Sequence, residues 1–188
     1  LVARKGKEPI ACVTAYDYTS ARIVDSAGMD FVLVGDSLGM VMQGKDSTVS
    51  VTLDEMIYHS KMVRRGVEYA FMVTDMPFGT VNTVQEGLAN CVRVIKETGA
   101  DALKIEGATD TVLEITRRVT DMGINIMGHI GLMPQYVATM GGYRIQGFDN
   151  CDDLIAQAKA FSDAGSQLLL LEGIEAECAG TITQSVPA

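Results

Sequence analysis

Ionisable side chains follow five of the short apolar runs in this sequence, each at the same place in its run. They are Asp36, Asp75, Glu106, His129 and Glu172. In a barrel of alternating strands and helices, the C-terminal ends of the strands converge on one mouth, where catalytic residues sit. One acidic residue after a strand can equally be a helix cap or a solvent contact. Five at equivalent positions favour a shared site.

The three carboxylates Asp36, Asp75 and Glu106 would repel one another in a confined mouth, and a cation with oxygen ligands would offset that repulsion. Mg²⁺ is therefore the expected metal. Zinc is disfavoured because the only histidines are His59 and His129, and His59 falls inside a predicted helix.

Lys104 and His129 each have more than one interpretation. Lys104 lies two positions before Glu106, so the alternation of a strand points both side chains to the same face. Lys104 could balance the charge of Glu106 or Asp75, bind a substrate anion, or do both. His129 could be hydrogen-bonded inside the mouth or take part in catalysis.

Strands and helices alternate along the whole chain. The predicted strands are 12–16, 31–35, 70–74, 102–105, 124–128 and 167–171, and glycines 28, 66, 99, 123 and 165 are predicted to end the intervening helices. Thr52 with Glu55, and Thr83 with Glu86, fit capping boxes for helices near 53–65 and 84–98. The pattern suits a barrel or a doubly wound sheet, and the lack of a Gly-x-Gly-x-x-Gly turn after the first strand favours the barrel.

Composition further limits the class of protein. The 188 residues are 47% hydrophobic and carry a net charge of −9, which suits one domain and makes a nucleic-acid partner unlikely. No apolar run is long enough to span a bilayer, and no signal peptide is visible at the start. We expect a soluble, cytoplasmic protein without a membrane partner. Its four cysteines, which are widely spaced, are predicted to be reduced and buried: Cys12, Cys91, Cys151 and Cys178.

An ordered series of motifs resembles the ketopantoate hydroxymethyltransferase family. The series is Thr14-Ala15-Tyr16-Asp17-Tyr18, Val34-Gly35-Asp36-Ser37-Leu38-Gly39, Gln43-Gly44-x-Asp46-Ser47-Thr48, Asp75-x-Pro77-Phe78, Lys104-Ile105-Glu106-Gly107, Gly128-His129-Ile130-Gly131-Leu132 and Gly141-Gly142-Tyr143-x-x-Gln146-Gly147. Each string alone is weak, but seven in this order are a strong signal. The resemblance implies a (β/α)8 barrel of the phosphoenolpyruvate mutase/isocitrate lyase-like kind, with about six β/α units in residues 1–188.

The same resemblance implies an activity and residue roles. Family members transfer a hydroxymethyl group from 5,10-methylenetetrahydrofolate to 3-methyl-2-oxobutanoate, giving 2-dehydropantoate in pantothenate synthesis. By resemblance, Asp36 and Asp75 would ligate Mg²⁺, and Glu106 would complete the metal site directly or through water. Asp36, Ser37, Asp75 and Lys104 would surround the oxo acid. Glu172 would be the base that removes the proton from C3. A homo-oligomer, with a decamer as the expected size, is implied as well.

Two alternatives stay open. One is a Mg²⁺-dependent carbon-carbon lyase or mutase acting on 2-oxo acids, although the Lys-Lys-Cys-Gly-His loop of the lyases is missing. The other is an inactive barrel fragment. The family continues beyond the position of Ala188, and the chain starts at Leu1, so we expect a single barrel domain over 1–188 whose C-terminal units, and some upstream residues, are missing.

Overall fold

Six strands alternate with helices in the computed structural model, which describes residues 2–187. The strands are β1 (Cys12–Thr14), β2 (Phe31–Val34), β3 (Phe71–Asp75), β4 (Ala102–Glu106), β5 (Asn125–Gly131) and β6 (Leu168–Glu172). The α-helices are α1 (Tyr18–Ser26), α2 (Leu38–Val41), α3 (Leu53–Gly66), α4 (Val84–Thr98), α5 (Asp110–Asp121), α6 (Cys151–Asp163) and α7 (Ala176–Ser185). Short 3-10 helices occupy Val2–Arg4 and Pro134–Tyr136. The predicted repeat of strand and helix is confirmed.

The sheet has the consecutive strand order β1-β2-β3-β4-β5-β6. Strand β1 pairs with β2, β2 with β3, and β5 with β6, in each case in parallel. A doubly wound sheet would reverse its order at a switch point, whereas a barrel adds each strand beside the previous one. The observed order therefore confirms six β/α units of the barrel kind.

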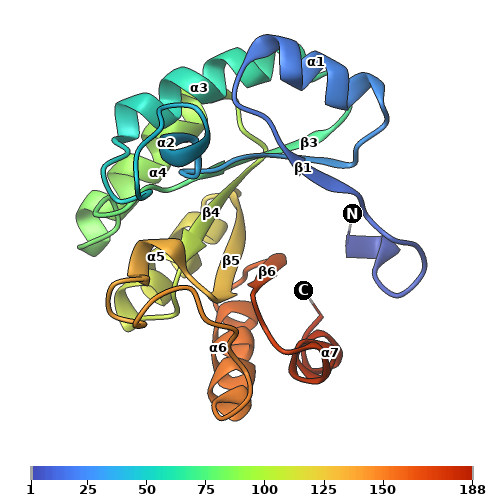
Figure 1. Ribbon diagram of the computed structural model, residues 1–188, viewed down its shortest axis with the longest axis vertical. Helices are drawn as coiled ribbons and strands as arrows, with labels where there is room; N and C mark the ends of the chain where they lie inside the picture. Colours follow the sequence, from blue (N-terminus) through green and yellow to red (C-terminus); the bar gives the residue numbers. More distant parts are fainter. Residues whose placement is uncertain (1, 188) are drawn as a thin grey trace. The chain divides into compact units, whose positions relative to one another are not determined.

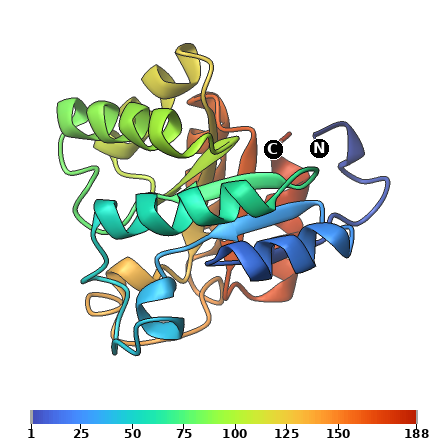
Figure 2. The ribbon, with the colours of Figure 1, turned by 90° about the horizontal axis from the view of Figure 1, so that it is seen from above.

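The chain divides into two compact units, and the boundary falls inside β4, after Leu103. In the first unit, α1 lies beside α3 and α3 beside α4 (Figures 1 and 2). Side chains from β2, β3 and α3 form its core, including Val32, Val34, Met56, Val63 and Met72. Each of these five is completely buried.

The second unit is built around the pairing of β5 with β6, with α5 and α6 packed on β5 and α7 packed on α6. Gly128 of β5 makes the packing of α6 possible, because a Cβ there would lie 2.6 Å from the ring of Phe161. That ring is completely buried. The glycine thus lets a large aromatic side chain approach the strand backbone.

The predicted helix ends are mostly confirmed. Thr52 and Glu55 form the full capping box of α3, and the Thr83 side chain accepts from the N–H of Glu86 at α4. Glycines 28, 99, 123 and 165 all have a positive φ just after a helix, as predicted.

Gly66 is a correction to this pattern. It is the last residue of α3 and has no positive φ. The C-cap of this helix is Val67, in an extended conformation. A Cβ on Gly66 would lie 2.7 Å from both the Ala21 Cβ and the Tyr18 carbonyl oxygen. Gly66 therefore allows α3 to approach α1 closely, and it does not serve as a left-handed cap.

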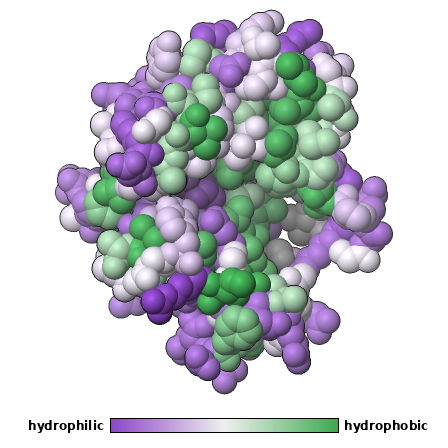
Figure 3. Space-filling model, viewed as in Figure 1, coloured by the Kyte–Doolittle hydropathy of each residue, from purple (hydrophilic) through white to green (hydrophobic). Residues whose placement is uncertain are grey.

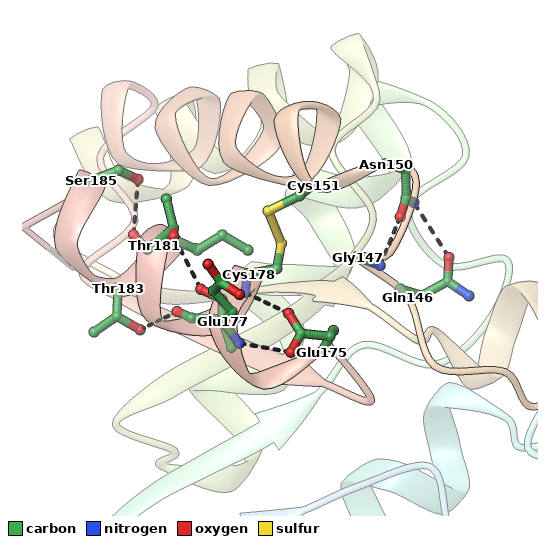
Figure 4. Close-up of a disulfide and its surroundings, with 12 residues drawn as sticks. Gln146, Gly147, Asn150, Cys151, Glu175, Glu177, Cys178, Thr181, Thr183 and Ser185 are labelled. Atoms are coloured by element: carbon green, nitrogen blue, oxygen red, sulfur yellow. Dashed lines mark hydrogen bonds between the residues drawn. A yellow bond between two sulfur atoms is a disulfide. The ribbon is translucent and has the colours of Figure 1, made fainter.

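The cysteine prediction is wrong for three of the four residues. Cys151 and Cys178 form a disulfide between α6 and α7, with their Cα atoms 5.7 Å apart (Figure 4). Cys12 is a free but exposed thiol, and only Cys91 is both free and buried. The pairing was missed because the two residues stand 27 positions apart and meet only through tertiary packing. Closing a loop of this size stabilises a fold by about 3.5 kcal/mol in the chain-entropy description.

Within residues 2–187, no helix has both the length and the apolar character that crossing a bilayer requires. Exposed hydrophobic residues do occur, and Figure 3 shows them as green areas among hydrophilic ones. Two of them, Ile145 and Phe148, lie in the loop that precedes α6 and are 61% and 70% exposed. That loop therefore contributes little to the core.

Replacing Gly66 with alanine tests the close approach of α3 to α1. The new methyl group would overlap Ala21 and Tyr18, so we expect Gly66→Ala to lower the free energy of unfolding by about 1–3 kcal/mol. Gly180→Ala is the matched control in α7, where a Cβ meets no atom within 4 Å. Because alanine favours a helix, this control is expected to gain up to about 1 kcal/mol. Urea denaturation measures both, and equal effects of the two substitutions would contradict the packing argument.

Candidate active site

The first unit brings together Asp36, Ser37 and Asp75 at the C-terminal ends of β2 and β3. Asp75 is the last residue of β3, and Asp36 stands two residues beyond the end of β2. Both carboxylates are buried, and the Asp36 N–H donates to Asp75 Oδ2 over 3.3 Å. The sequence prediction that these two residues meet is confirmed.

Ser37 begins α2 without making a side-chain cap. Its Oγ lies 2.8 Å from the phenolic oxygen of Tyr16. Tyr16 is held in turn by His59, whose Nδ1 donates to the Tyr16 carbonyl oxygen over 2.7 Å. His59 lies inside α3, as predicted, and supports the site through the backbone. Sequence reasoning assigned no role to Tyr16, although the motif at residues 14–18 could have indicated it.

The second unit brings together the ionisable residues of β4, β5 and β6. Lys104 Nζ lies 3.4 Å from Glu106 Oε1 and 3.2 Å from His129 Nδ1. The side chains of Lys104 and Glu106 are 5% and 1% exposed. The predicted pairing of Lys104 with Glu106 is confirmed, and it compensates two charges that burial would otherwise destabilise.

His129 connects this pair to Glu172. Its Nε2 lies 3.0 Å from the Leu132 carbonyl oxygen and 3.4 Å from Glu172 Oε2. A carbonyl only accepts, so Nε2 carries a hydrogen and donates it to Leu132, with Glu172 Oε2 close to the same nitrogen. Nδ1 lies 3.2 Å from Lys104 Nζ and 3.3 Å from Glu106 Oε1. This geometry supports the hydrogen-bonding interpretation of His129 over a role as base.

The electrostatics of Glu106 reflect competing effects. Burial by itself would raise the pKa of the carboxyl group, but the adjacent side chains of His129 and Lys104 and the amide of Gln135 together hold the pKa below its usual value. The Gln135 N–H donates to Glu106 Oε2 over 3.1 Å. Glu106 is therefore an anion in the folded protein at neutral pH.

His129 and Glu172 differ in their exposure to solvent. His129 lies inside β5, two residues before the strand ends, and is completely buried. Glu172 ends β6, and its side chain is 42% exposed. A carboxylate that is reachable from solvent, beside a buried hydrogen-bond donor, can accept a proton from a bound molecule.

Solved structures share this fold. Crystal structures of 2,3-dimethylmalate lyase, a member of the phosphoenolpyruvate mutase/isocitrate lyase superfamily, and of oxaloacetate acetylhydrolase match with TM-scores of 0.70 and 0.71. The matches cover 97% and 95% of this chain and 65% and 64% of those chains, at 21% and 17% identity. The chain therefore shares the fold of these two enzymes, and this is the kind of fold that the resemblance implied.

The sequence comparisons are more specific. The family model described as ketopantoate hydroxymethyltransferase matches residues 1–188. Proteins named 3-methyl-2-oxobutanoate hydroxymethyltransferase from Nitratidesulfovibrio vulgaris (strain DP4) and Geobacillus sp. (strain WCH70) are 50% and 45% identical over 95% and 97% of this chain. The chain belongs to the ketopantoate hydroxymethyltransferase family. It spans 59% and 66% of the length of those two relatives.

Neutralising Lys104 tests the buried cluster. In the presence of a chelator, Lys104→Met should lower the free energy of unfolding by about 3–5 kcal/mol, because Glu106 would stay buried without its cation. Lys61→Met is the matched control, since Lys61 pairs with Glu97 at the surface with 42% and 34% exposure. That exposed pair should contribute at most about 1 kcal/mol. Urea unfolding at pH 7 measures both, and a loss of under 1 kcal/mol for Lys104→Met would contradict the prediction.

Proposed function

We propose that the protein transfers a hydroxymethyl group from 5,10-methylenetetrahydrofolate to 3-methyl-2-oxobutanoate, giving 2-dehydropantoate. The observation that carries this proposal is the family match over residues 1–188, together with relatives of that name at 45–50% identity. The buried polar groups described above supply suitable chemistry. Release of tetrahydrofolate from the two substrates, measured on the full-length protein, is the direct test.

We propose that Asp36, Asp75 and Glu106 ligate one Mg²⁺ ion. Each of the three carboxylates is buried, and an all-oxygen donor set suits Mg²⁺ better than zinc. A fold neighbour, phosphonopyruvate hydrolase, was crystallised with oxalate and Mg²⁺. Bound by these residues, the ion would act as a Lewis acid toward the keto and carboxylate oxygens of the oxo acid.

The oxo acid would be held by Asp36, Ser37, Asp75 and Lys104. The Ser37 hydroxyl is oriented by Tyr16 and can donate to a carboxylate oxygen. The Lys104 ammonium is desolvated, so its attraction for developing negative charge on the substrate is stronger than in water. Its bond to His129 Nδ1 limits where the ammonium group can move.

Glu172 is the proposed base. The proton on C3 of 3-methyl-2-oxobutanoate moves to the Glu172 carboxylate, and C3 bonds to the methylene carbon of the folate donor. Both bonds from that carbon to the folate nitrogens break, and water supplies the hydroxyl oxygen. The two nitrogens take up the proton from Glu172 and one from the water, so tetrahydrofolate leaves. Two observations support this role: the Glu172 side chain is partly exposed, and its carboxylate lies 3.4 Å from His129 Nε2. Glu172 is also not one of the proposed metal ligands. In this scheme His129 is a positioning residue.

Three further expectations stay predictions: the single domain over residues 1–188, a cytoplasmic location, and a homo-oligomer of decameric size. Limited proteolysis tests the single domain, cell fractionation tests the location, and light scattering measures the size of the oligomer.

Metal removal tests the ligand set. A chelator should abolish activity, and Mg²⁺ should restore it. Asp75→Asn should weaken Mg²⁺ binding by calorimetry at least about 10- to 100-fold, because the substitution removes a buried anionic ligand. Asp54→Asn, at a carboxylate that is 78% exposed, is the matched control and should bind as the wild type does. Unchanged Mg²⁺ affinity in Asp75→Asn would exclude this residue as a ligand.

Replacing Glu172 tests the base. Glu172→Gln keeps the shape but cannot accept a proton, so exchange at C3 of 3-methyl-2-oxobutanoate should fall by about 10²–10⁴-fold while Mg²⁺ binding persists. Proton NMR in deuterated water follows this step without folate. Glu177→Gln, at an exposed glutamate of α7, serves as the control. If Glu172→Gln exchanges at the wild-type rate, the base is another group, and His129 is the next one to replace.

A further inference from the structure

The disulfide joins the starts of two helices in the second unit. Cys151 is the first residue of α6, and Cys178 is the third residue of α7 (Figure 4). The Cys178 N–H donates to Glu175 Oε2 over 2.9 Å, so the first turn of α7 is also tied to the segment before it. The disulfide therefore links the loop that precedes α6 to the segment between β6 and α7.

A second connection joins the same two segments. Gln146 pairs with Ile174 in an isolated parallel bridge. The Gln146 N–H donates to the Gly173 carbonyl oxygen, and the Glu175 N–H donates to the Gln146 carbonyl oxygen, each over 2.8 Å. The bridge and the disulfide lie only a few residues apart along both segments.

Gly147 brings the two connections into direct contact. It has a φ of +96°, and a Cβ there would lie 3.1 Å from Cys178 Cβ and 3.2 Å from its Sγ. The Gly147 N–H also donates to Asn150 Oδ1 over 2.7 Å, just before Cys151 (Figure 4). A shift of the Cys178 side chain would therefore displace Gly147 and the loop around it.

Two large side chains of this loop lie at the surface. Ile145 and Phe148 are 61% and 70% exposed, so burial of these large side chains contributes little to its stability. Segments with few buried contacts open locally at low free-energy cost unless cross-links hold them. The bridge and the disulfide are thus two connections that help to hold it in place.

Glu172 directly precedes the residues that are held in this way. Its carbonyl oxygen accepts from the Leu132 N–H over 2.7 Å, and Gly173 then enters the bridge to Gln146. We propose that Cys151 and Cys178 form a thiol–disulfide exchange site, whose closed form orders residues 173–178 and thereby positions Glu172. The consequence for catalysis rests on the proposed function, whereas the exchange chemistry and the ordering do not.

The exchange partner is a small thiol and its disulfide, such as glutathione. Cys178 is buried but Cys151 is only partly so, which makes the Cys151 sulfur the accessible one. An external thiolate attacks Cys151 Sγ, the protein S–S bond breaks, and Cys178 leaves as a thiolate that takes up a proton. A second thiolate then attacks the external sulfur of the mixed disulfide and releases Cys151. The protein gains two electrons, and two small thiols become one disulfide.

The surroundings favour a reversible bond over a permanent one. Cys12 and Cys91 remain thiols in the same chain. In the cytoplasmic location proposed above, thiols are kept reduced, and disulfides there are mostly transient and serve catalysis or redox sensing. A pair joining two surface segments next to the proposed base fits that use.

Peptide-resolved hydrogen exchange tests the ordering. The full chain is incubated with reduced or oxidised glutathione, and alkylation followed by mass spectrometry counts the free thiols. We expect two thiols in the oxidised form and four in the reduced form. Amides in residues 141–150 and 173–182 should exchange about tenfold faster after reduction, while α4 in the first unit should be unchanged.

Two variants separate the disulfide from general effects of reduction. Cys178→Ser should show the fast exchange under both conditions. Cys12→Ser, which removes the exposed free thiol, should respond to glutathione as the wild type does. Equal exchange in the oxidised and reduced wild type would overturn the proposal, as would four free thiols in oxidised protein.

The catalytic consequence is measured separately. Proton exchange at C3 of 3-methyl-2-oxobutanoate should fall severalfold on reduction and remain low in Cys178→Ser. If C3 exchange is absent in both redox states while the amide data change as expected, the proposed function fails and the exchange site stands. If C3 exchange is present but equal in both states, the disulfide does not position Glu172.

Discussion

The buried ion pair between Lys104 and Glu106 is the interaction on which the candidate site depends. Two charges on one strand are almost fully withdrawn from water, and each would be unstable without the other. Their positions two residues apart in β4 make the pairing a direct result of strand geometry. The same pair contacts His129, whose Nδ1 lies 3.2 Å from Lys104 Nζ and 3.3 Å from Glu106 Oε1, while its Nε2 lies 3.4 Å from Glu172 Oε2. The Lys104–Glu106 pair therefore compensates buried charge and also sets the surroundings of His129.

Much of this arrangement could be predicted because it follows from local rules. Asp75, Glu106 and Glu172 end their strands, and parallel strands in consecutive order carry such residues to the same edge of the sheet. The capping box at Thr52 was visible because its partners are three residues apart. In each of these cases, neighbouring residues contain the information that determines the structure.

The errors concern contacts between distant residues. Gly66 follows the spacing of a helix end, but its small size is required by Ala21 and Tyr18 on another helix. Cys151 and Cys178 have no motif spacing, and they meet only because α7 packs on α6. The link from Tyr16 to Ser37 spans 21 residues and joins the turn after β1 to the start of α2. Periodicity cannot predict such pairs, since they depend on how complete elements pack.

The surroundings of Glu172 combine constraints from its own strand with contacts between distant residues. On one side, the carboxylate faces a buried histidine whose orientation is fixed by the core of the sheet. On the other, the chain runs into an exposed segment held by two backbone hydrogen bonds and one covalent bond. As the proposed base, Glu172 would have to be positioned to within a fraction of an ångström and still be reachable by substrate, so it could not be enclosed by packing on every side. Cross-linking the exposed segment satisfies both requirements, because a disulfide restricts motion without covering the carboxylate.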